Sequence, residues 1–269
     1  GPMPEGLKKR AVDQLALMNT TAQGLEIGTH LLRPRGPLDS LESLSQSGRA
    51  ALFSCLAEIS TEAAVSLLER ATKGLSFDEK KGICGDTRRN IIWALDKICF
   101  AKNTFERGAS LMLDLAVAEN ENWGNNATGQ FKSFFPVQLG DTEAGAEERL
   151  RVLSDAIKEA AESGDRKKLL IIVEALLSGI ELNHFSRSVG AETHGSKPAL
   201  KSWTPKIWKD LWDYVEKCCD HLIELAKRTD EVGKAAKEGL GQRFRSLALR
   251  APLFHIVEKA VKEITAIHG

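Results

Sequence analysis

The sequence is poor in the residues that build β-sheets. Tyrosine occurs once in 269 residues and runs of β-branched residues are scarce, whereas alanine, leucine, glutamate and lysine are abundant. β-Branched and aromatic side chains favour strands, and the abundant residues favour helices. Nearly every apolar pattern repeats at three and four residues, which is the spacing of one helix face. We therefore predict an all-α protein.

Long hydrophobic runs are also missing. The longest, such as LLIIVEALLSGI at residues 169–180, are interrupted by Glu174 and are too short to cross a bilayer. No basic stretch followed by an apolar core opens the sequence, so no signal peptide is expected. The five cysteines are odd in number and mostly stand in apolar helical patterns, which favours a reducing compartment. We therefore expect a cytoplasmic protein without a membrane partner.

An excess of charge of one sign is absent as well. The chain has 37 lysines and arginines and 37 aspartates and glutamates, so its formal net charge is zero. A neutral protein has no general attraction to nucleic acid or to anionic membranes. Any contact with nucleic acid would therefore depend on local basic patches.

The first three residues, Gly1-Pro2-Met3, resemble the remnant of a cleaved purification tag. This leaves open that the chain is a fragment of a longer protein. Residues 4–269 are predicted to form a single α-helical repeat domain, with a long loop at about 181–203. The predicted helices cover residues 5–19, 38–44, 48–59, 61–72, 88–98, 104–118, 147–162, 167–180, 204–228, 230–249 and 252–267. Thr104 and the pair Thr204-Pro205 are read as start signals.

Two helix pairs in the first half resemble each other. The segment that begins RAALFSCLAEI at Arg49 aligns with RRNIIWALDKI at Arg88, an offset of 39 residues. The second helices align from Ala64 and Ala109, an offset of 45 residues. A helix pair that recurs every ~40–47 residues is typical of HEAT and armadillo repeats. The predicted architecture is therefore a right-handed α-solenoid of such pairs.

Catalytic and metal-binding patterns are weak. GAETHGSK at residues 190–197 approaches the phosphate loop GxxxxGK[ST], but Ser196 and Lys197 are exchanged and no strand precedes them. Cys218, His221 and Glu224 lie three residues apart on one helix face, without the partner ligands that a closed metal site needs. We predict no catalytic residue, no metal ligand and no cofactor, and an enzyme is less expected than a binding protein.

Basic residues interleaved with aromatic ones are the candidates for partner binding. The first group, in the long loop, comprises Arg187, Lys197, Lys201 and Trp203; the second is Arg243 with Arg245 and Arg250. Such groups suit a phosphate backbone or an acidic protein surface. The alternatives are a loop that links repeats, with Trp203 packed on the next helix, and a solvated helix face.

The stretch AENENWGNNATG at residues 118–129 follows an apolar helical pattern. The carbonyls at the end of that helix need partners, and asparagine both tolerates left-handed backbone and bonds nearby backbone groups. We predict a structural corner made by Asn120, Asn122, Trp123, Asn125 and Asn126, with at least one amide buried and fully bonded. Asn126 or Thr128 would cap a short helix that carries Phe131, Phe134 and Phe135.

The segments RRNIIWALDKICF from Arg88, the stretch from Phe105 that contains NNATG and FKSFF, and KPALKSW from Lys197 carry a resemblance. Together they resemble the HEAT-like helical repeats of large bacterial STAND-type NTPases and related anti-phage defence proteins, over about residues 85–205. Gly124 beside the asparagines and Ala199-Leu200 depart from the pattern. The resemblance implies a sensing or scaffolding segment whose enzymatic module lies elsewhere, and it carries over no catalytic residue.

Three functions remain open from the sequence. The main hypothesis is a non-catalytic binding or scaffolding module of a bacterial, anti-phage defence protein, because solenoids present long surfaces to partners. Its partner would be a protein or another domain of a longer chain, with nucleic acid possible through local basic patches. The alternatives are a stand-alone helical enzyme with an unrecognised site and a structural oligomerisation element.

Overall fold

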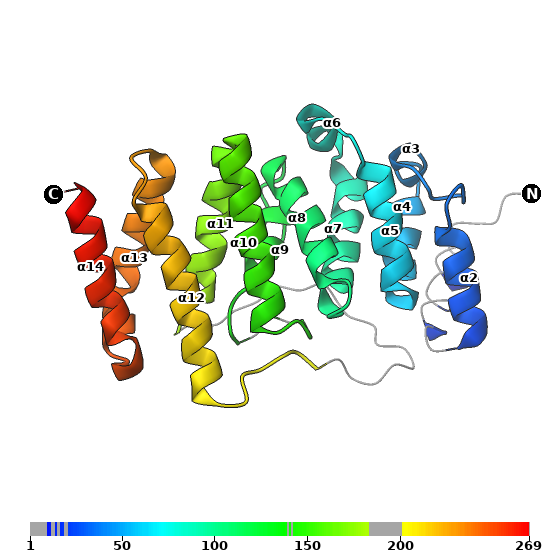
Figure 1. Ribbon diagram of the computed structural model, residues 1–269. Helices are drawn as coiled ribbons and strands as arrows, with labels where there is room; N and C mark the ends of the chain where they lie inside the picture. Colours follow the sequence, from blue (N-terminus) through cyan, green and yellow to red (C-terminus); the bar gives the residue numbers. More distant parts are fainter. Residues whose placement is uncertain are drawn as a thin grey trace, which may run out of the picture. The chain divides into compact units, whose positions relative to one another are not determined.

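Figure 1 shows the computed structural model of the chain, which describes residues 21–138, 140, 142–182 and 201–268 together with residues 10, 11, 14, 17 and 18. Within these residues the secondary structure is helical and contains no strand, so the predicted all-α class is confirmed. Among the described helices, none combines the length and the hydrophobicity that a bilayer crossing requires. Most of the predicted helix at residues 5–19 lies outside the described part.

The chain divides into two compact units, and each is described by itself. The first comprises Gly1–Gln130 with Ser188–Lys201, and the second comprises Phe131–Arg187 with Ser202–Gly269. The prediction of a single domain and that of solenoid geometry along the whole chain stay predictions.

The helices of the first unit follow the predicted pairs. Helix α4 (Arg49–Ile59) packs on α7 (Gly85–Phe100), and each is followed by its partner, α5 (Thr61–Thr72) and α8 (Phe105–Val117) respectively. The hydroxyl of Ser60 caps α5 by accepting from the Ala63 N–H. The four helices predicted between residues 48 and 118 are therefore confirmed.

Charged side chains link successive helices of this unit. Arg107 on α8 donates to Glu69 and to the Ser66 hydroxyl of α5, each at 2.8 Å. Lys97 on α7 donates to the Ser54 carbonyl of α4 at 3.1 Å and pairs with Glu58. These contacts fix the order of the helices around the apolar core.

Two helices of the first unit were not predicted. Helix α2 (Ala22–Leu32) lies where a loose segment was expected, and its glycines weakened the helical pattern. Gly28 is needed for packing, because a Cβ there would stand 2.8 Å from Cγ2 of Ile59. Helix α6 (Phe77–Gly82) lies in the predicted loop at 74–86, where Ser76 and Glu79 form a capping box. A third short helix, α3 (Leu41–Leu44), falls inside the predicted range 38–44.

The second unit contains the later helices. Helices α10 (Ala146–Ser163) and α11 (Arg166–Gly179) form a pair, and α11 also packs against α12 (Trp208–Ala226) and α13 (Glu231–Ala248). A short 3-10 turn, η1 (Ala251–Leu253), precedes α14 (Phe254–His268), which packs on α12 and α13. Helix α11 is thus covered on more than one side, as its apolar circumference predicted.

Of the two predicted start signals, Thr104 does stand at the start of a helix but without the predicted cap bond, and Thr204-Pro205 is wrong. Thr104 precedes α8, but its hydroxyl donates to the Ile98 carbonyl at 2.7 Å and makes no cap bond. Thr204-Pro205 does not begin a helix, since α12 begins at Trp208. In the segment before it, the Trp203 N–H donates to the Thr142 carbonyl at 2.7 Å.

Candidate functional site

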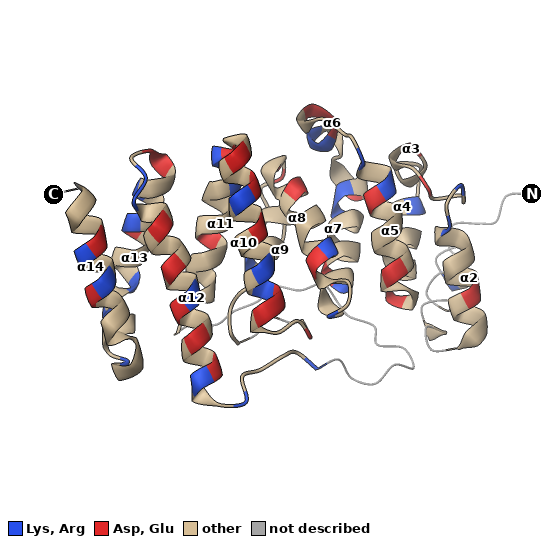
Figure 2. Cartoon of the chain, in the orientation of Figure 1, with Lys and Arg blue, Asp and Glu red and all other residues tan. Residues whose placement is uncertain are grey.

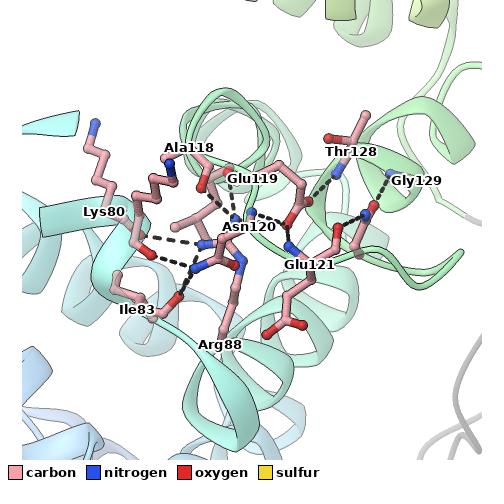
Figure 3. Close-up of polar contacts among 12 residues, drawn as sticks. Lys80, Ile83, Arg88, Ala118, Glu119, Asn120, Glu121, Thr128 and Gly129 are labelled. Carbon is pink, nitrogen blue, oxygen red and sulfur yellow. Dashed lines mark hydrogen bonds and ion pairs between the residues drawn. The ribbon is translucent and has the colours of Figure 1, made fainter. Parts of the chain in front are cut away.

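The corner at residues 118–129 is organised by a buried arginine. Arg88, in the first turns of α7, is 0% exposed. Its Nη2 donates to the carbonyls of Leu115 at 2.7 Å and Ala118 at 3.3 Å, and its Nη1 donates to those of Ile83 at 3.3 Å and Lys80 at 3.4 Å (Figure 3). One guanidinium therefore serves both the end of α8 and the segment after α6.

Glu119 continues this network toward the next helix. Its Oε1 lies 3.2 Å from Nη2 of Arg88 and accepts from the backbone N–H groups of Asn120 and Glu121. Its Oε2 accepts from the N–H of Thr128 at 3.1 Å, at the start of α9 (Ala127–Ser133). A carboxylate at a helix start is favourable, so Glu119 joins two elements electrostatically.

Two of the four asparagines bond backbone groups, as predicted. Asn126 caps α9, with Oδ1 accepting from the Gly129 N–H and Nδ2 donating to the Glu121 carbonyl, both at 2.9 Å. Asn120 Nδ2 donates to the carbonyls of Ile83, at 3.0 Å, and Lys81. In the described structure the amides of Asn122 and Asn125 have no such partner.

The burial predicted for this corner is wrong. None of the four asparagines is buried, and Asn126 is only half-buried. Trp123 is half-buried too, with Nε1 donating to Glu121 at 3.0 Å and its ring 5.7 Å from the Arg89 guanidinium. The buried polar group is Arg88, whose spacing from Ile91, Ile92 and Leu95 already indicated an inward position. The network joins helix ends and offers no reactive group.

The basic residues predicted to bind a partner do not form one patch. Arg187 and Lys197 lie outside the described residues, and Lys201 is exposed. Arg243 lies 3.0 Å from a carboxylate oxygen of Glu181, while Arg245 is exposed on the same helix. The charge of Arg243 is thus offset inside the second unit.

Trp203 packs differently from the prediction. The guanidinium carbon of Arg149 lies over the Trp203 ring, 5.4 Å from the ring centre. Trp203 therefore packs at the start of α10 and not on the next helix along the chain. Arg149 is buried and donates to the carbonyls of Ala144 at 3.0 Å and Pro136 at 2.8 Å. Burial lowers the pKa of Arg149. Trp203 therefore belongs to a structural contact.

Cys218 and Cys219 are both buried. Burial raises the pKa of Cys218 to about 12, so its thiol stays protonated at neutral pH. Tyr214, one turn earlier, donates to the Phe135 carbonyl at 2.7 Å. Across the described segments, no three His, Cys, Asp or Glu side chains are grouped to hold a metal ion.

A groove in the second unit is the strongest candidate for a binding site. It has an open volume of about 280 Å³. Its described lining comes from the segment after α9, the segment after α11, the start of α12 and the turn after α13. The lining residues are Val137, Gln138, Leu182, Trp208, Leu211, Trp212 and Arg250; we call this set the aromatic groove.

Two stacked indoles form one wall of the aromatic groove. Trp208 and Trp212 stand four residues apart on α12, so they share one helix face. Their ring centres are 5.6 Å apart and the planes differ by 13°. Trp208 is 73% exposed, and its neighbour Ile207 is 59% exposed. Large apolar side chains with this exposure are typical of contact surfaces.

The electrostatics of the aromatic groove rest on one charge. Arg250 is the one charged residue of the described lining, and it has no ion-pair partner among the described residues. Lys209, next to Trp208, pairs with Asp213 on the same helix. Helix α12 begins at Trp208 without a side-chain cap, so the positive end of its dipole lies at this wall.

Sequence reasoning did not single out the aromatic groove. The spacing of WKDLW, with tryptophans at i and i+4, was a signal for one face. The helix was instead read for its buried face. Arg250 was singled out only within the basic group of Arg243 and Arg245, and Val137 and Leu182 are far away in sequence.

A comparison with protein-family models, curated proteins and solved structures finds no match to this chain.

Proposed function

We propose that this chain is a non-catalytic binding module that recognises a protein partner through the aromatic groove. The resemblance of residues 85–205 to the helical repeats of bacterial STAND-type NTPases and anti-phage defence proteins suggests the setting. In that setting the module would sense or scaffold, and a catalytic module would belong to another part of the assembly.

The observation that carries the proposal is the exposed indole pair. Trp208 presents 73% of its surface to solvent although it stands beside a groove lined by Leu182 and Leu211. Tryptophan is enriched among the residues that dominate binding energy at protein interfaces, because it buries a large area at little cost in side-chain entropy. The stacked pair also holds both rings in place before any partner arrives.

The chemistry of the described residues supports binding rather than catalysis. The buried thiol of Cys218 stays protonated, and the polar network around Arg88 is engaged by backbone carbonyls. The aromatic groove contains an amide and a guanidinium, neither of which serves as a general base at neutral pH. These features favour recognition of a partner surface.

The test compares three immobilised proteins: the wild-type chain, the variant Trp208→Ala/Trp212→Ala, and the control Phe77→Ala. Phe77 is an exposed aromatic residue of the first unit, so the control removes a similar surface elsewhere. Each immobilised protein is exposed to a lysate of the source organism. We then purify the proteins that bind to the wild type and the control but not to the groove variant. Their dissociation constants are then measured by calorimetry.

We expect a purified partner to bind the groove variant at least about tenfold more weakly than the wild type or the control. Circular dichroism verifies that all three proteins are folded. The proposal fails if every purified partner binds the groove variant as tightly as the wild type. If the only partner is a second copy of the chain, seen by analytical ultracentrifugation, the chain is an oligomerisation element instead.

A further inference from the structure

We infer that the aromatic groove takes a peptide segment in which a carboxylate stands beside an apolar or aromatic side chain. This inference rests on the proposed function and names the chemistry of its partner. It follows from the shape of the groove, from its one free charge and from the charges around it.

The size and lining of the aromatic groove limit which ligands can enter it. An open volume of about 280 Å³ is at the small end of the range for ligand pockets, so the groove admits a few side chains rather than a folded surface. Leu182, Leu211 and Val137 make its apolar lining, against which an aliphatic or aromatic side chain would lose its water. The flat faces of Trp208 and Trp212 favour a partner that lies along them.

The charge selects an anion. Arg250 lines the groove, is exposed, and has no carboxylate partner in the described ranges. A guanidinium binds a carboxylate through two parallel hydrogen bonds, which gives both affinity and orientation. The uncapped start of α12 has the same sign, although Asp210 in its first turn reduces that contribution. The carboxylate of a single aspartate, a single glutamate or a chain terminus would be attracted by this positive potential.

A nucleic acid fits less well. Helix α12, which supplies both indoles, carries Asp210, Asp213, Glu216, Asp220 and Glu224 against Lys209 and Lys217. Figure 2 shows these acidic positions recurring along α12. A phosphate backbone with its repeated charge would be repelled by this helix, whereas one carboxylate at Arg250 avoids it. The arrangement therefore favours a peptide over single-stranded DNA or RNA.

The experiment selects a phage-displayed library of short random peptides on the wild-type chain, with counter-selection on Trp208→Ala/Trp212→Ala. An enriched peptide is synthesised together with a version in which Asp or Glu is replaced by Asn or Gln. Both are titrated into the wild type, into Arg250→Gln and into the control Arg245→Gln. Arg245 is an exposed arginine of the same unit outside the groove, so the control removes an equal charge.

We expect enriched peptides to carry an acidic residue next to Leu, Phe or Trp. Arg250→Gln and the amide version of the peptide should each weaken binding about tenfold, and the two changes together should cost little more than one, because they remove the same contact. Arg245→Gln should bind as the wild type does.

Three results would overturn the inference. They are enriched peptides without acidic residues, unchanged binding of the enriched peptides by Arg250→Gln, and a selection that enriches no peptide. A labelled single-stranded oligonucleotide that binds the wild type and is lost with the two tryptophans would replace the peptide by a nucleic acid. In the first two results, the proposed function still stands if the enriched peptides fail to bind Trp208→Ala/Trp212→Ala. The capture of partners from a lysate tests the proposed function separately.

Discussion

Arg88 shows how this protein uses a buried charge. Isolated burial of a guanidinium is costly, and here backbone carbonyls and Glu119 offset that cost. Arg149 in the second unit makes the same kind of contact at the start of its helix. Both arginines are the fourth residue of their helix, and each donates to the carbonyl five residues earlier, that of Ile83 or of Ala144. An arginine thus anchors the entry of a helix in each unit.

Replacing Arg88 should therefore destabilise the protein strongly. Arg88→Met keeps much of the volume but leaves the carbonyls of Leu115 and Ala118 without a donor and Glu119 without its cation. We expect the free energy of unfolding, measured by urea denaturation, to fall by about 3–5 kcal/mol. Arg89→Met is the matched control, because Arg89 is exposed and pairs with Asp86 only at the surface. Equal losses for the two variants would contradict the role assigned to Arg88.

At the scale of elements, side-chain caps set many of the helix starts. Ser60, Ser76, Asp165 and Asp230 each accept a backbone N–H three residues later, and their sequence positions make such starts readable. Asp230 is the most strongly held. Hydrogen bonds from Arg228, together with the Gly233 N–H, lower its pKa from 3.8 to about 2.

The cap at α13 should make stability depend on pH. Because the pKa of Asp230 is lower in the folded state, its contribution is fully present above pH 3.8 and is lost as the pH falls through about 2. Asp230→Ala should lower the free energy of unfolding by about 1 kcal/mol near neutral pH. The difference from wild type, measured by urea denaturation at several pH values, should shrink toward acid.

The control for this measurement is Asp155→Ala, which removes an exposed carboxylate from the body of α10. It should leave the free energy of unfolding nearly unchanged at neutral pH. If Asp230→Ala lowers the free energy of unfolding by the same amount from neutral to acid pH, the stabilisation does not depend on the charge of Asp230, which would contradict the prediction.

At the scale of the whole molecule, the charges balance. The formal net charge is zero, and basic and acidic residues alternate along α10 and α14 in Figure 2. Across the described residues, the predicted basic group of α13 is also offset by the pair of Arg243 with Glu181. Balanced charge of this kind provides little counterion release on a phosphate backbone.

The chain should therefore bind duplex DNA weakly at most. We expect fluorescence anisotropy with a labelled duplex to show no binding at about 0.15 M salt and no steep dependence on salt below it. Binding that falls steeply between about 0.05 and 0.2 M salt would contradict this and would indicate several phosphate contacts. In that case Lys201→Gln and Arg245→Gln would show which of the predicted basic residues make them.

The helical class, most helices and several caps were predictable because they depend on neighbours in the sequence. The pattern of three and four at residues 48–118 identified four helices, and the Asn126 cap followed from the local need of a helix start. Burial was less predictable. The asparagines looked like the buried polar groups of the corner, but Arg88 takes that place because it reaches two separate helix ends at once.

The sequence by itself determined that this protein is helical, electrically balanced and without a strong catalytic motif, since composition and periodicity are local properties. The tertiary structure decided what those properties could not. Helix α2 packs with Gly28 so close to Ile59 that a Cβ would not fit, and the Trp203 N–H donates to the carbonyl of Thr142, which is distant in sequence. The aromatic groove joins Val137, Leu182, Trp208 and Arg250, which only folding brings together, because packing rather than sequence distance selects the side chains that meet.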